Sequence, residues 1–224
     1  MKNDGSSETV RAPIGVVLAG GMGRRLGGPD KPCVELAGRS MFDRVVDRLS
    51  PQVDQVVVSA NTNPDRFRAR AVPVIADTVP GHVGPLAGIL AGLRWAAAHR
   101  PDALFVVSVA VDTPFFPRNL VLAMSESRGS DERAIALASS AAGVHPVFGL
   151  WPVALADDLE AFLRSGANPK VMAFVDRHVR VDAPFDNMTL ADGTSVDPFF
   201  NVNTPQDLAS ARRIAAALDA AEKP

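Results

Sequence analysis

Apolar stretches that end in glycine or polar residues alternate along this chain with stretches of helical periodicity. The segment 14–18 is apolar and rich in β-branched residues, and it runs into Ala19-Gly20-Gly21, which predicts a buried strand that leads into a turn. Ser40 followed by Asp43 resembles a capping box, and apolar residues then recur at helical spacing. This pattern predicts a helix over residues 41–49.

The same alternation continues beyond residue 50 and becomes richer in strands after residue 134. Gly84-Pro85 is predicted to open a helix that runs to about residue 99, because proline is tolerated at the first helical position. Pro117, Pro152 and Pro205 are predicted to begin further helices. Short apolar segments predict strands at 56–58, 72–77, 104–109, 134–139, 147–150, 179–181 and 199–202.

Strands and helices that alternate with short connections are typical of a doubly wound α/β layer. Right-handed crossovers place the helices of such a layer on both faces of the sheet. We therefore expect a single-domain, doubly wound, Rossmann-like three-layer sandwich over residues 14–221, with a mostly parallel, partly mixed sheet. Residues 1–13 carry charges of both signs and no apolar block, so we expect them to form a disordered tail.

Charge and cysteine content exclude several classes of protein. Of 224 residues, 23 are Lys or Arg and 25 are Asp or Glu, so no overall basic field would attract nucleic acid or an anionic membrane. No apolar run approaches the roughly 18 residues that a membrane helix needs. The lone Cys33 cannot form an internal disulfide, which fits a reducing cytoplasm. Its side chain is expected to be buried and to act as an apolar group. An anionic ligand must therefore be bound locally.

The segment 18–32, Leu-Ala-Gly-Gly-Met-Gly-Arg-Arg-Leu-Gly-Gly-Pro-Asp-Lys-Pro, is the richest in candidate chemistry. Its glycines let backbone amides approach a ligand, and Arg24, Arg25 and Lys31 add positive charge beside them, which favours a polyphosphate. Lys31 is followed by proline rather than Ser or Thr, so the segment is not a Walker A loop. Arg24 and Arg25 cannot both point inward if this stretch is helical.

Polar residues end several of the predicted strands. Asp77 ends a predicted strand, Asn61 and Asp112 lie just beyond two others, and the carboxyl edge of a parallel sheet is where ligands usually bind. The Asp112 carboxylate could hold Mg²⁺. Asn201 and Asn203 lie two apart in a segment predicted to be extended, so they should face the same side. The alternative is that these residues only shape turns, and Asn203 in particular precedes a good helix start.

Taken in order, these segments resemble the molybdenum cofactor guanylyltransferases, the MobA family of the nucleotide-diphospho-sugar transferase superfamily. The resemblance covers roughly residues 14–214. Besides the glycine loop, it includes Ser59-Ala60-Asn61, Ile75-Ala76-Asp77, Gly84-Pro85-Leu86-Ala87-Gly88, Val111-Asp112-Thr113-Pro114, His145-Pro146, Val171-Met172-Ala173-Phe174 and Asn201-Val202-Asn203-Thr204-Pro205.

The resemblance implies Mg²⁺-dependent transfer of GMP from GTP to the phosphate of molybdopterin that carries molybdenum, with release of pyrophosphate. It also implies two kinds of possible protein partner. One kind delivers molybdopterin, and the other is specific to a molybdoenzyme and receives the product. The nucleotide-binding residues would be Leu18, Ala19, Gly20, Gly21, Lys31, Asn61, Asp77, Pro85 and Asp112. Lys31, Arg25 and Arg24 would act on the phosphates, Asp112 and Asn203 would hold the metal, and Lys170, Asn201 and Asn203 would bind the acceptor.

Several alternatives remain open at this point. Related enzymes use CTP on the same cofactor, and guanylyl transfer to another phosphorylated small molecule fits the same motifs. A nucleotide sensor or cofactor chaperone with this fold is the non-enzymatic alternative. In place of the two basic residues common in the family, this chain has Pro169-Lys170, which weakens the assignment of the acceptor. His145 could be functional or structural.

Overall fold

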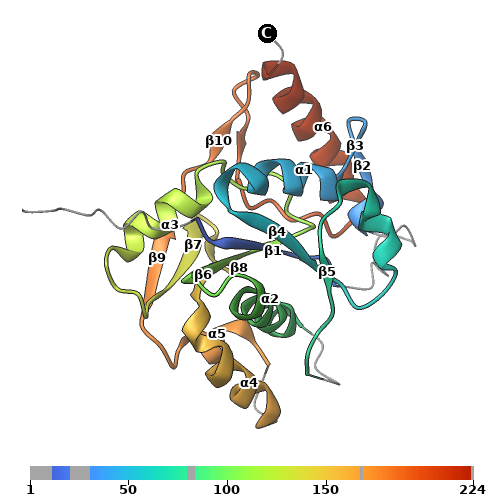
Figure 1. Ribbon diagram of the computed structural model, residues 1–224. Coiled ribbons are helices and arrows are strands. Elements are labelled where there is room, and N and C mark those ends of the chain that lie inside the picture. Colours follow the sequence, from blue (N-terminus) through green and yellow to red (C-terminus); the bar gives the residue numbers. More distant parts are fainter. Residues whose placement is uncertain (1–11, 21–30, 80–83, 167–168, 223–224) are drawn as a thin grey trace, which may run out of the picture.

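The computed structural model describes residues 12–20, 31–79, 84–166 and 169–222, and a seven-stranded sheet lies at its centre (Figure 1). The strand order is β5-β4-β1-β6-β8-β7-β9. Only β8 in this sheet runs antiparallel to its neighbours, β6 and β7, so the expected mostly parallel, partly mixed sheet is confirmed. The strands are β1 (Ile14–Leu18), β4 (Gln55–Ser59), β5 (Val74–Ile75), β6 (Phe105–Ala110), β7 (Ile135–Ser140), β8 (Gly143–Pro152) and β9 (Arg180–Pro184).

Helices cover both faces of this sheet, as expected for a three-layer sandwich (Figure 1). Successive side chains of a strand point to opposite faces, so β1 contributes to two cores. Val17 packs on the face covered by α1 (Met41–Leu49) and α3 (Leu120–Arg128), and Val16 packs on the opposite face. That opposite face is covered by α2 (Pro85–His99), α4 (Ala156–Arg164) and α5 (Val171–Val175).

A third, smaller core lies beside the sandwich, under the helix α6 (Pro205–Ala221). Ile214 of α6 packs with residues of two short hairpins and with Phe115. The hairpins are β2 (Glu35–Leu36) with β3 (Arg39–Ser40), and β10 (Met188–Thr189) with β11 (Ser195–Val196). The 3-10 helices are η2 (Lys31–Cys33), η3 (Ser50–Gln52), η4 (Pro64–Arg70) and η5 (Val153–Leu155).

Helices begin as predicted where local capping determines the start. Both α1 and α2 have the predicted limits, and Ser40 caps α1 by accepting a hydrogen bond from the Asp43 backbone N–H at 3.0 Å. Pro205 does begin α6, where Thr204 and Asp207 form a capping box. Because these signals lie within a few residues of the helix start, they can be recognised in sequence.

Two predictions of secondary structure were wrong. The helix expected at Pro117 starts at Leu120, because the Pro117 carbonyl accepts hydrogen bonds from Leu120 and Gln52 in a turn. Pro152 is the last residue of β8, paired with Phe105 of β6, and it is also the N-cap of η5, which leads directly into α4, so a helical segment does begin there as predicted.

The second wrong prediction is the strand over 199–202. In the structure this segment is a turn followed by irregular backbone. Its backbone donors are used elsewhere: Phe199 N donates to the Asp197 side chain at 2.8 Å, and Val202 N donates to the Asp112 carbonyl at 2.8 Å. These bonds replace the regular ladder that a strand would need.

We expect replacement of Gly92 by alanine to destabilise the fold. Gly92 of α2 faces β1, and a Cβ there would lie 2.4 Å from Cγ2 of Val16. Alanine gains about 1 kcal/mol in helix propensity over glycine, whereas overpacking costs about 1–3 kcal/mol. A net loss of up to about 2 kcal/mol in the free energy of unfolding by urea is expected. Ala97→Ser, at an exposed position of α2, should stay within about 0.5 kcal/mol of wild type.

Candidate active site

The strand order reverses at β1, so the carboxyl end of β1 is the topological switch point of the sheet. β1 pairs in parallel with β4 on one side and with β6 on the other. The Leu18 carbonyl at the end of β1 accepts a hydrogen bond from Val111 N at 3.2 Å, so the segment after β6 lies beside the start of the glycine loop. Ligands of open α/β sheets bind at such a switch point.

Three of the predicted site residues meet here. The Lys31 ammonium donates to Oδ2 of Asp112 at 2.9 Å and to Oδ1 of Asn203 at 2.5 Å. Asp112 lies 81 residues and Asn203 lies 172 residues after Lys31 in the sequence. The Lys31 side chain retains 14% of its exposure and that of Asp112 23%, so solvent screens this ion pair only in part. Lys31 comes from η2, Asp112 follows β6, and Asn203 precedes α6.

The backbone around Asn203 is held from two sides. On one side, the neighbouring Val202 N–H donates to the carbonyl of Asp112. On the other side, Asn203 N donates to Oδ2 of Asp207 at 3.1 Å, in the first turn of α6. The pKa of Asp207 is lowered, most strongly by this bond from Asn203 N, with a small contribution from the charge of Lys31. Asn203 therefore shapes the turn before α6 and also contributes to the cluster.

The cluster has the chemistry of a small metal shell. Oδ2 of Asp112 and Oδ1 of Asn203 accept from the same ammonium, so both oxygens lie close enough to bind one cation. Carboxylate and amide oxygens are suitable ligands for Mg²⁺, which keeps several waters and binds substrate phosphates. In the part of the chain that the structure describes, no group of three or more His, Cys, Asp or Glu could hold a metal ion. The residues fit a metal that is shared with a phosphate ligand.

Asn61 and Asp77 form a second polar pair at the same edge, after β4 and β5. Nδ2 of Asn61 donates to Oδ2 of Asp77 at 2.6 Å, and Asp77 N donates to Oδ1 of Asn61 at 2.9 Å. Each residue thereby orients the other. A carboxylate that is oriented in this way and faces solvent can accept hydrogen bonds from hydroxyl groups of a ligand.

The other predicted site residues do not take part in the hydrogen bonds of the Lys31 cluster. Leu18, Ala19 and Gly20 lie at the end of β1, and Pro85 is the first residue of α2. Lys170 is exposed before α5, and Asn201 is exposed in the segment predicted as a strand. Neither belongs to the hydrogen bonds that unite Lys31, Asp112 and Asn203. The predictions for Gly21, Arg24 and Arg25 lie outside the described residues.

Cys33 is exposed, so the expectation of a buried side chain was wrong. Cys33 belongs to the short helix η2, in which Pro32 is the buried residue. The apolar contact of this segment is therefore made by the proline, and the adjacent cysteine faces solvent.

His145 belongs to a hydrogen-bond network that includes two residues missed by the sequence analysis. The Ser140 hydroxyl donates to Oδ2 of Asp197 at 2.7 Å and lies 2.8 Å from Nε2 of His145. The hydroxyl proton is directed to the carboxylate, so Nε2 of the neutral imidazole carries a proton and donates to Oγ. The imidazole stacks on Phe199 with ring centroids 4.3 Å apart. This network gives His145 structural partners, and the only sequence signal for it is that Asp197 lies just before the asparagine segment.

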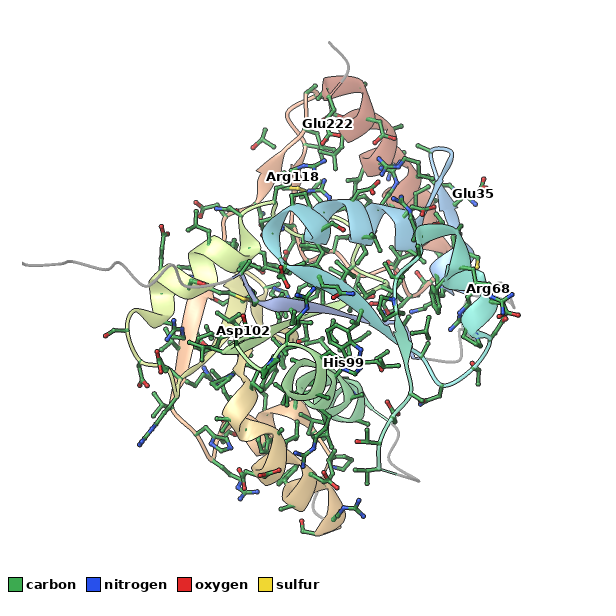
Figure 2. All side chains as sticks on the ribbon, in the orientation of Figure 1. Glu35, Arg68, His99, Asp102, Arg118 and Glu222 are labelled. Atoms are coloured by element: carbon green, nitrogen blue, oxygen red, sulfur yellow. The ribbon has the colours of Figure 1, made fainter. Side chains whose placement is uncertain are left out.

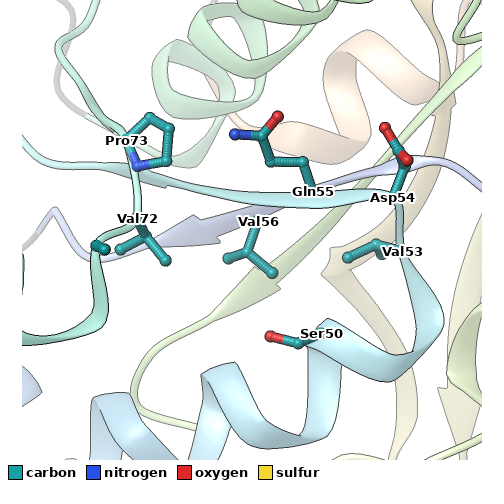
Figure 3. A pocket seen from close by; sticks show the side chains of 8 residues that line it. Ser50, Val53, Asp54, Gln55, Val56, Val72 and Pro73 are labelled. Carbon is teal, nitrogen blue, oxygen red and sulfur yellow. The ribbon is translucent and has the colours of Figure 1, made fainter.

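A pocket of about 210 Å³ lies away from this cluster (Figure 3). It is lined by Val53, Gln55 and Val56 at the amino end of β4, and by Val72 and Pro73 before β5. Ligands of doubly wound sheets bind at the carboxyl ends of the strands, so this pocket is not part of the site.

No helix in the described ranges is long and apolar enough to cross a bilayer.

Comparisons with known proteins agree with this geometry. Residues 15–181 match the family described as the MobA-like NTP transferase domain. The chain is 48% identical over 200 residues to the molybdenum cofactor guanylyltransferase of Rhodopseudomonas palustris, an alignment that covers 89% of this chain and 92% of that protein. The family match includes the positions of Lys31 and Asp112.

Solved structures share the fold. Molybdopterin-guanine dinucleotide biosynthesis protein A from Archaeoglobus fulgidus has a TM-score of 0.69 at 24% identity, with 91% of this chain and 98% of that chain covered. A manganese complex of a Mycobacterium tuberculosis protein has a TM-score of 0.59 at 18% identity, with 92% and 100% covered.

We expect His145 to make stability depend on pH. Burial lowers the pKa of His145, and the charge of Asp197 opposes this shift only in part. The unfolded chain therefore binds a proton near pH 6.5 that the folded protein binds only at lower pH. The free energy of unfolding should fall as the pH drops through about 6.5, and this slope should be smaller in His145→Gln.

Urea unfolding at several values between about pH 7.5 and 5.5 measures this slope. His99→Gln, at an exposed position, is the matched control and should retain the wild-type slope. An equally steep slope in His145→Gln and wild type would contradict the assignment.

Proposed function

Because the chain belongs to the MobA-like NTP transferase family and is a nucleotidyltransferase, we propose that it transfers GMP from GTP to the terminal phosphate of molybdopterin that carries molybdenum. The products are the molybdopterin guanine dinucleotide cofactor and pyrophosphate. The observation that supports this most directly is the convergence of Lys31, Asp112 and Asn203 at the switch point of the sheet. The name of the Rhodopseudomonas relative favours GTP as the nucleotide.

The reaction needs alignment and charge compensation more than proton transfer. A phosphate monoester is already an anionic nucleophile, so it can attack the α-phosphorus of GTP without a strong general base. Lys31, already directed into the cluster, would hold negative charge on the triphosphate, with Arg24 or Arg25 near the leaving group. Preorganised donors of this kind stabilise charge that develops in the transition state.

Asp112 and Asn203 would hold Mg²⁺ through the two oxygens that now accept from Lys31. When bound, the metal supplies positive charge to the phosphate oxygens. The manganese bound by the mycobacterial structure with the same fold supports the use of a divalent cation. Lys31 and the metal would then neutralise negative charge on the same triphosphate from adjacent positions.

The remaining assignments follow the same proposal. The backbone of Leu18, Ala19 and Gly20 would read the base, and Asp77, oriented by Asn61, would accept from the ribose hydroxyls. Gly21 and Pro85 would complete the nucleotide site, and Lys170 and Asn201 would contact the acceptor together with Asn203. The reaction would take place in the cytoplasm, with proteins that deliver molybdopterin or receive the finished cofactor as partners.

Incubation of the purified protein with Mg²⁺, molybdopterin and either GTP or CTP tests the function. Formation of the guanine dinucleotide with release of pyrophosphate is the expected result. Faster product formation from CTP would instead establish the cytidylyltransferase activity. Tight binding of GTP without Mg²⁺-dependent release of pyrophosphate would identify a nucleotide sensor or cofactor chaperone.

Lys31→Ala should lower the rate of turnover by about a hundredfold or more, which is the effect of removing one preorganised donor. The steady-state rate of pyrophosphate release measures this loss. Arg133→Ala, which removes an exposed cation before β7, is the control and should retain the wild-type rate. Near-normal turnover in Lys31→Ala would contradict the assigned role.

Asp112→Asn should raise the Mg²⁺ concentration needed for half-maximal activity, because the amide keeps the shape of the side chain but lacks its charge. Asn203→Ala should cause a smaller increase, since it removes a neutral ligand. Titration of the pyrophosphate release rate with Mg²⁺ gives both values. Asp192→Asn, at an exposed turn, is the control. An unchanged Mg²⁺ requirement in Asp112→Asn would argue against a metal at this position.

A further inference from the structure

Arg66 brings a cation to the edge where the glycine loop begins, although no motif marked it in the sequence. It belongs to η4, the helical segment that follows β4. Its Nη2 donates to the carbonyl of Ala19 at 3.4 Å, and its Cζ lies 4.7 Å from the ring centroid of Phe67. The side chain is half-buried. A charged side chain from a separate segment thus contacts the backbone at the end of β1.

The segment that carries Arg66 is fixed on α1 by its neighbours. The ring of Phe67 is buried and packs against Phe42 of α1, with centroids 4.7 Å apart. The Arg70 guanidinium donates to Asp43 at 2.5 Å and to Asp47 at 2.8 Å, both on α1. An aromatic contact and two ion pairs therefore fix η4 on a rigid element. The position of Arg66 is set by this attachment.

The Ala19 carbonyl is held differently from the adjacent backbone groups. Ala19 N donates to the Ser59 carbonyl at 3.0 Å, and the Leu18 carbonyl accepts from Val111, so strand-end backbone holds both of these groups. The Ala19 carbonyl, by contrast, accepts from a side chain. A carbonyl oxygen has two lone pairs, so it can accept from Arg66 and still accept a hydrogen bond from a ligand.

We propose that Arg66 is a positioning residue for the base end of the nucleotide, acting through the Ala19 carbonyl. This inference rests on the proposed function, in which the backbone of Leu18, Ala19 and Gly20 reads the base. The Watson–Crick edge of guanine presents N–H donors that a fixed carbonyl can accept, whereas the triphosphate presents only acceptors. Arg66 therefore strengthens the binding of GTP through its base and leaves the binding of the phosphates unchanged.

The test compares two arginines of the same segment. Arg66→Ala should bind GTP about tenfold more weakly in calorimetry with Mg²⁺, which is the effect of losing one hydrogen bond from a charged donor. Its KM for GTP should rise while its kcat stays near the wild-type value. Arg68→Ala is the matched control, because Arg68 retains 80% of its exposure, pairs with Asp65 and lies at the rim of the molecule (Figure 2). This control should bind GTP as wild type does.

Two further measurements separate positioning from a general structural effect. Inorganic triphosphate, which lacks a base, should bind Arg66→Ala and wild type equally well. Arg66→Lys, which keeps a charged donor, should recover part of the lost GTP affinity, and thermal unfolding should show that each variant is folded.

Equal GTP affinity in Arg66→Ala and Arg68→Ala, while wild type binds GTP, would overturn this inference alone. An equal loss of affinity for GTP and for inorganic triphosphate would overturn it as well. A wild-type protein that neither binds GTP nor forms the dinucleotide would overturn the proposed function, and this inference with it.

Discussion

The parallel pairing of β1 between β4 and β6 is the constraint on which the rest of the molecule depends. This pairing places the ends of three strands side by side, and Val111 and Ser59 hold the backbone of Leu18 and Ala19 between them. α2 also approaches β1 closely, at Gly88 and Gly92, which face Leu18 and Val16 of this strand. The arrangement of polar residues at the carboxyl edge therefore depends on the packing of the central strand.

The second requirement is that distant segments stay attached to this edge. Asn203 follows Val202, which is bonded to the Asp112 carbonyl, and precedes α6, which begins with a capping box. Near its other end, α6 is held by Asp219, whose carboxylate accepts two hydrogen bonds from the buried Arg44 guanidinium at 2.8 and 2.6 Å. Removing Asp219 would leave the buried Arg44 guanidinium without its carboxylate partner, so this change should weaken the docking of α6.

The sequence predicts the parts of the structure that depend on nearby residues. The limits of α1 follow from its Ser40 cap and its periodicity, and the start of α2 follows from Gly84-Pro85. The expectation that polar residues at the ends of parallel strands meet at one edge of the sheet brings Asp112 close to the glycine loop. The turn over 199–202 could not be predicted from local sequence alone, because Val202 N donates to the carbonyl of Asp112, which is distant along the chain, although Asp197, the partner of Phe199 N, is nearby. The same reason explains why Ser140 and Arg66 were missed. Each acts through a partner far along the chain, at a distance that only the folded structure defines.

The position of α6 in the chain has a consequence for the order of assembly. A ribosome releases the residues of β1, β4 and β6 long before those of α6, and domains made in this order can begin to fold as they emerge. The nascent protein could thus pair its central strands and bring Lys31 near Asp112 while Asn203 is still unmade. The amide oxygen that completes the pair around the ammonium arrives only with the last helix. A newly made chain would therefore pair its central strands earlier than it completes the cluster of Lys31, Asp112 and Asn203.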